Sequence, residues 1–74
     1  MSEAEMEKLA GLLVVLVLDG ENNRWVSDHL FERLRTLNAK EMAQFCRKIA
    51  RRGRSADEIR RCLAYFANRL GEST

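Results

Sequence analysis

Residues 38–70 read NAKEMAQFCRKIARRGRSADEIRRCLAYFANRL, and this stretch predicts two helices joined by a short turn. On both sides of Gly53, apolar residues recur every three or four positions, as they do on the buried face of a helix. Gly53 follows two arginines, and glycine and arginine are both typical of helix C-termini. We therefore expect helices over 39–52 and 56–70 that pack against each other as an αα-hairpin.

Side chains that can accept hydrogen bonds from unpaired backbone N–H groups indicate where helices begin. The proposed N-caps are Ser2, Ser27, Asn38 and Ser55. A glutamate follows three residues after each of them except Ser27, and this is the spacing of a capping box. Turn residues at Asp19-Gly20 and Asn22-Asn23 end the first segment. The predicted helices span 3–18, 28–36, 39–52 and 56–70.

The end of the first segment allows a second interpretation. Residues 14–18, Val-Val-Leu-Val-Leu, are also compatible with a buried strand, because β-branched residues favour extended backbone. Such a strand would pair with residues 24–26 across the intervening turn. Short apolar runs separate helix from strand poorly, so both readings stay open here.

If the first segment is helical, it has two apolar faces, and each needs a covering surface. The second face contains Leu12, Val15 and Leu18. Either Trp25 and the neighbouring helix or a second copy of the chain can cover it. A C2 homodimer is the commonest solution for a small helical protein, so we expect a dimer.

Composition indicates one small all-α domain. The chain of 74 residues has no proline and four glycines, so few positions interrupt helices. Hydrophobic residues make up 46% and charged residues 32%, which is the balance of a folded protein. We expect a single domain over 1–74, a bundle of three long helices and one short helix, orthogonal or antiparallel, with a tail at 72–74.

Neither a membrane span nor a secretory signal is expected. The most apolar run, at 9–18, is about half the ~20 residues that a helix needs to cross a bilayer. Glu3, Glu5 and Glu7 precede it, where a secretory signal would have positive charge. These carboxylates instead suit the positive end of a helix dipole. We expect a cytoplasmic protein.

The side chains with catalytic or metal-binding chemistry form no recognisable motif. His29 is the only histidine, and no nucleophile signature accompanies it. Cys46 and Cys62 are too few for a disulfide framework, and with His29 they lack the spacing of a zinc site. Buried free thiols in a reducing compartment are the simplest interpretation. We therefore predict no enzyme activity, no metal, no cofactor and no small-molecule substrate.

Charge is distributed unevenly along the chain. Residues 1–37 contain four basic and seven acidic side chains, whereas residues 38–74 contain nine basic and four acidic ones. The basic residues around the predicted 53–55 turn are Arg47, Lys48, Arg51, Arg52, Arg54, Arg60 and Arg61. Such a cluster can contact phosphates or an acidic protein surface. It can also be a solvated face that includes pairs such as Asp57–Arg61.

The same segment has the turn glycine of a helix-turn-helix motif, but two features disfavour that motif. Charged Arg52 and Arg54 occupy the turn, and Asp57 and Glu58 stand where a recognition helix would meet bases. We assign no family.

Two functions follow from these patterns. The first is a non-enzymatic regulatory or adaptor protein that binds itself and a larger protein partner, through Leu12, Val15, Leu18 and Trp25 and the basic cluster. The alternative is a dimeric DNA- or RNA-binding regulator that uses the basic cluster on backbone phosphates.

Overall fold

Four α-helices and no β-strand make up the part of the chain described by the computed structural model, residues 1–19 and 24–71. These are α1 (Glu3–Leu18), α2 (Arg24–Leu34), α3 (Ala39–Arg52) and α4 (Ala56–Gly71). The predictions for α1 and α3 are confirmed, and α4 ends one residue later than predicted. The predicted turn residues at 20–23 and the tail at 72–74 lie outside the described residues.

The start of α2 was predicted wrongly. The helix begins at Arg24 rather than after Ser27, and it ends at Leu34 rather than at residue 36. Ser27 lies inside the helix, buried, and its hydroxyl group forms a 2.6 Å hydrogen bond with the hydroxyl group of Tyr65 on α4. This tertiary contact outweighs the preference of serine for a capping position. Because residues 14–18 and 24–26 are helical, the strand-pairing alternative is also wrong.

One complete capping box is present among the described residues, at the start of α3. The Glu41 backbone N–H donates to Oδ1 of Asn38 at 2.8 Å, and the Asn38 N–H donates to the Glu41 carboxylate at 3.1 Å. At α4, Ser55 Oγ accepts from the Glu58 N–H at 3.2 Å, but the Glu58 carboxylate accepts from the backbone of Arg54. The predicted helix start is confirmed there, without the reciprocal bond.

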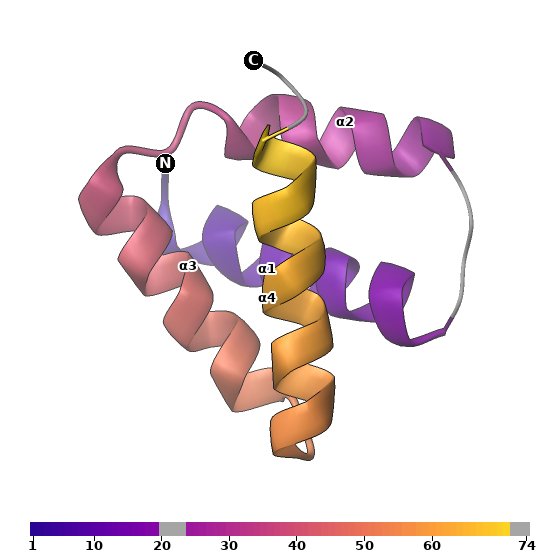
Figure 1. Ribbon diagram of the computed structural model, residues 1–74. Helices are drawn as coiled ribbons and strands as arrows, with labels where there is room; N and C mark the ends of the chain where they lie inside the picture. The colour runs from indigo at the N-terminus through magenta and orange to yellow at the C-terminus, as the bar shows by residue number, and fades with distance from the viewer. Residues whose placement is uncertain (20–23, 72–74) are drawn as a thin grey trace.

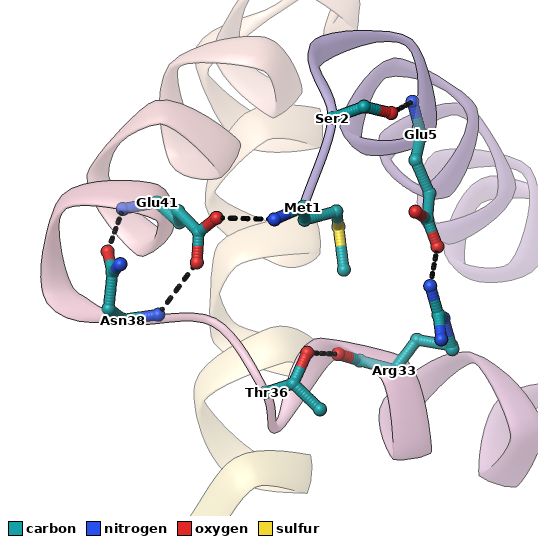
Figure 2. Close-up of polar contacts among 7 residues, drawn as sticks. All are labelled: Met1, Ser2, Glu5, Arg33, Thr36, Asn38 and Glu41. Carbon is teal, nitrogen blue, oxygen red and sulfur yellow. Dashed lines mark hydrogen bonds and ion pairs between the residues drawn. The ribbon is translucent and has the colours of Figure 1, made fainter.

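The first turn of α1 is fixed by contacts to α2 and α3 (Figure 2). Ser2 Oγ accepts from the Glu5 backbone N–H at 3.1 Å, as a cap should. The Glu5 side chain does not complete the box but pairs with Arg33 near the end of α2. The amino group of Met1 lies 2.8 Å from the carboxylate of Glu41, and this contact and the Asn38 backbone lower the pKa of Glu41.

The helices form two antiparallel pairs that lie across each other (Figure 1). α1 and α2 run side by side in opposite directions, and α3 and α4 form the predicted hairpin. α4 passes over α1 and contacts α2 through Tyr65 and Arg69, whose guanidinium group is 2.5 Å from Asp28. The arrangement therefore has both antiparallel pairs and helices that cross, which the sequence analysis had left as alternatives.

The core lies where the two pairs cross. It contains Leu9, Ala10, Leu13, Leu16, Leu30, Phe31, Leu34, Leu37, Phe45, Ile49, Cys62 and Phe66. Phe66 of α4 contacts both α2 and α3, because its ring centre lies 5.0 Å from that of Phe45 and 6.1 Å from that of Phe31. Tilted aromatic pairs at these separations add to the stabilisation from burial.

The turn between α3 and α4 depends on a close approach at Gly53. Its φ of −74° and ψ of 137° are extended, so the left-handed conformation common at helix ends is not what favours glycine here. A Cβ atom at this position would lie 2.2 Å from Cγ1 of Ile59. Glycine is present because Ile59 occupies the space that a side chain would need.

Candidate interaction surfaces

The seven basic residues of the predicted cluster do not form one surface. Lys48 and Arg52 are paired with carboxylates of α1. The other five side chains are exposed: Arg47, Arg51, Arg54, Arg60 and Arg61. Within residues 1–19 and 24–71, no carboxylate forms an ion pair with any of these five guanidinium groups. The predicted Asp57–Arg61 pair is therefore not formed in this structure.

Lys48 is buried on the inner side of α3, so it belongs neither to a solvated face nor to an exposed basic cluster. The residue is 4% exposed, and its ammonium group lies 2.5 Å from the Glu3 carboxylate and 2.9 Å from the Glu7 carboxylate. These hydrogen bonds raise the pKa of Lys48. The aliphatic part of the side chain is buried, while its charge is neutralised by residues that reach solvent.

Arg52 forms the second link between α3 and α1. Its Nη2 atom lies 3.1 Å from the Glu7 carboxylate and 3.2 Å from the Glu7 backbone carbonyl oxygen. The guanidinium group packs over Gly11, where a Cβ atom would lie 3.3 Å from Nη1. The hydrogen bond from Lys48 lowers the pKa of Glu7 most, and the hydrogen bond from Arg52 lowers it further. The glutamates of α1 thus bind neighbouring helices, a role beyond the predicted stabilisation of the helix dipole.

Three of the four predicted partner-binding residues are exposed apolar side chains. Leu12 is 43%, Val15 51% and Trp25 75% exposed. Leu18 is half-buried and packs against the edge of the core. The second apolar face of α1 is therefore left largely uncovered by the described parts of the chain.

Leu12 and Trp25 line the same shallow groove between α1 and α2. Its volume is about 110 Å³, and its other lining residues are Leu9, Val26, His29, Leu30 and Arg33. The Trp25 indole stacks on the His29 ring, with ring centres 5.8 Å apart and planes 13° from parallel. One wall of the groove is thus a stacked pair of rings.

The groove opens into a wider hollow along the first half of α1. This hollow has a volume of about 570 Å³ and is lined by Ala4, Glu5, Lys8, Leu9, Leu12, His29 and Arg33. The groove and the hollow share four lining residues, so they form one continuous depression. The shared residues are Leu9, Leu12, His29 and Arg33. We call the two together the α1–α2 groove.

A second hollow lies beside α1, at the turn between α3 and α4. Its volume is about 290 Å³, and its lining residues are Val14, Val15, Leu18, Asp19, Arg52, Arg54 and Glu58. Apolar side chains of α1 line it together with charges of both signs. We call it the α1–turn hollow.

The residues with catalytic or metal-binding chemistry are dispersed. His29 is exposed in the stack with Trp25, and Cys46 and Cys62 are free thiols whose pKa values are raised by burial. A raised pKa disfavours the reactive thiolate. Among the residues with described positions, no three His, Cys, Asp or Glu side chains gather where a metal ion could bind.

His29 and Arg33 line the α1–α2 groove, although neither was among the predicted partner-binding residues. They follow Trp25 at intervals of four residues, so all three lie on one side of α2. That spacing would have indicated the groove if the helix had been predicted to begin at residue 24.

No described helix is both long and apolar enough to cross a membrane. No protein-family model, curated protein or solved structure matches the chain.

Proposed function

We propose that the protein is a small non-enzymatic regulatory or adaptor protein that acts by binding other proteins and forms a homodimer through α1. The observation behind this proposal is the exposure of Leu12, Val15 and Trp25 on a domain whose other large apolar side chains are buried or half-buried in the described residues. Exposed apolar patches on small domains are typical of protein interfaces. Two free cysteines support a location in the cytoplasm.

The α1–turn hollow supports the homodimer. It combines apolar Val15 and Leu18 with basic Arg54 and with the acidic side chains of Asp19 and Glu58. In a two-fold interface, each residue of one copy meets the partner copy's equivalent surface. A patch with charges of both signs around an apolar centre can be complementary to itself. We infer that two α1 helices pack against each other at Val15.

The oligomeric state tests the homodimer directly. Sedimentation velocity of the full chain should report a dimer that dissociates on dilution. Val15→Glu should give a monomer with an unchanged helical circular dichroism spectrum, because the side chain is 51% exposed and its substitution leaves the core intact. Ala64→Glu, at an exposed position of α4, is the matched control and should remain dimeric. A wild-type protein that is monomeric at every concentration would refute the homodimer.

A second function, binding of nucleic acid, is favoured by the five exposed arginines that form no ion pairs with the described carboxylates. Guanidinium groups bind phosphates through paired hydrogen bonds, and the association weakens steeply with salt. Arg52 and Lys48 are not among the proposed phosphate contacts, because they form ion pairs with glutamates of α1.

Binding of generic duplex DNA and RNA across a salt titration tests this second function. A steep negative slope of log K against log salt should be reduced in the triple variant Arg47→Gln, Arg51→Gln and Arg54→Gln. Arg52→Gln should not be included in the variant, because it would also break the ion pair between α3 and Glu7 of α1. Absence of binding at low salt would eliminate the nucleic-acid function.

A further inference from the structure

The apolar part of the α1–α2 groove, between Leu12 and Trp25, is smaller than a typical pocket for a cofactor or a drug-sized ligand. Its volume is about 110 Å³. Pockets for cofactors and drug-sized ligands measure roughly 300–1,000 Å³, whereas an apolar cavity of roughly 150 Å³ accommodates benzene. The space between Leu12 and Trp25 therefore suits one large apolar side chain.

The wider part of the groove indicates an elongated occupant. It follows α1 from Ala4 to Leu12, which is about 12 Å at 1.5 Å per residue. Two turns of a partner helix have about this length. The apolar face of such a helix, with residues at positions i, i+3 or i+4, and i+7, would lie along Leu9 and Leu12. The stacked rings of Trp25 and His29 form a wall at one end.

Charge at the groove favours an acidic occupant. Among the described residues that line it, Glu5 is the only carboxylate, and it is bound to Arg33 (Figure 2). The Arg33 side chain is still 54% exposed, and a guanidinium group has five N–H donors, so it can bind a second carboxylate. Lys8 is exposed beside it and has no ion-pair partner among the described residues. A second copy would bring Lys8 and Arg33 against their own equivalents, which disfavours self-association in this groove.

We propose that the α1–α2 groove binds an amphipathic helix of a partner protein. The helix inserts one large apolar side chain between Leu12 and Trp25 and places carboxylates opposite Lys8 and Arg33. This inference rests on the proposed protein-binding function and names the second partner. It uses the side of α1 that faces α2, whereas the homodimer uses the side that faces the turn between α3 and α4.

Selection from a displayed library of peptides about four helical turns long tests the inference with the full chain as bait. Selected peptides should have apolar residues at helical spacing with Asp or Glu at flanking positions. Trp25→Ala or Leu12→Glu should weaken a selected peptide at least roughly tenfold, as expected for a central apolar contact. Lys8→Glu should weaken it less and reduce its salt dependence, because an exposed charge at the edge contributes mainly to association.

Two control variants separate this groove from the other surfaces. Val15→Glu should dissociate the homodimer and leave peptide affinity unchanged. The triple Arg47, Arg51 and Arg54 to Gln variant should also bind the peptide normally. Three results would each overturn the inference. They are selection of basic peptides, binding by Trp25→Ala as tight as by the wild type, and loss of binding only in the triple arginine variant. A dimeric protein that selects no peptide would overturn it too, while the homodimer would remain established.

Discussion

The ammonium nitrogen of Lys48 lies 2.9 Å from a carboxylate oxygen of Glu7, so the middle of α3 is joined to the second turn of α1. Arg52 donates to the same carboxylate from the next turn of α3. Both cations lower the pKa of Glu7, and Glu3 and Glu7 together raise the pKa of Lys48. The stability of this domain should therefore depend on the protonation state of Glu7.

Acid should weaken the link between α1 and α3. Because the pKa of Glu7 in the folded protein is below its ordinary value of 4.5, the carboxylate stabilises the fold above that value. The stabilisation is lost as the pH falls through the folded-state pKa. Urea unfolding at a series of pH values should show that Glu7→Gln is less stable than the wild type at neutral pH. The difference should shrink progressively below about pH 4.5.

Glu32→Gln is the matched control, because Glu32 is exposed on α2 and takes part in no ion pair with the described residues. Its stability should follow the wild-type curve. If Glu7→Gln and the wild type differed by the same amount at every pH, the ion pairs with Lys48 and Arg52 would not be the cause.

Gly53→Ala should destabilise the protein although the backbone conformation permits alanine. The new Cβ atom would lie 2.2 Å from Cγ1 of Ile59, so the side chain or the turn must move. Overpacking of this kind costs about 1–3 kcal/mol in the free energy of unfolding. Gly71→Ala is the control, since no described atom beyond its own helical turn lies within 4 Å of its added Cβ, and its change should stay within about 0.5 kcal/mol. Equal effects in the two variants would contradict the steric explanation.

Much of this fold could be predicted because local signals agreed with one another. Asn38 and Ser55 cap the helices that their spacing to Glu41 and Glu58 indicated. Apolar periodicity gave the same boundaries for α3 and nearly the same for α4. The start of α2 could not be predicted in this way. Ser27 would locally prefer a capping position, but its hydroxyl group is hydrogen-bonded to Tyr65 of α4, which is distant in the sequence.

The surfaces were predicted less completely, because they depend on how the helices meet. The two apolar faces of α1 are evident from the sequence, and the exposure of Leu12 and Val15 was expected from them. No pattern in the sequence indicated that glutamates of α1 would form ion pairs with Lys48 and Arg52. Because of these ion pairs, Lys48 and Arg52 are not part of an unpaired basic cluster. Helical periodicity identifies a face but does not say which neighbour covers it.

The Ser27–Tyr65 hydrogen bond should couple α2 to α4 by a measurable energy. Ser27 is 4% exposed and its hydroxyl group lies 2.6 Å from that of Tyr65. Tyr65→Phe should cost about 1 kcal/mol by leaving the serine hydroxyl unpaired. Ser27→Ala also raises helix propensity, so a double-mutant cycle is needed to isolate the pair. Denaturant unfolding of the four proteins should give a coupling energy of about 1 kcal/mol, and additive effects would show that the bond does not contribute.

Trp25 should contribute little to the stability of the isolated domain. Its side chain is 75% exposed, whereas Phe31, six residues later in α2, is fully buried. Phe31→Ala should cost about 3–5 kcal/mol, a large part of what so small a domain has. Trp25→Ala should change the free energy of unfolding by no more than about 0.5 kcal/mol, measured by circular dichroism because Trp25 is the only tryptophan. A loss comparable to that of Phe31→Ala would show that Trp25 belongs to the core, and a docking role for its exposed face would then have no physical basis.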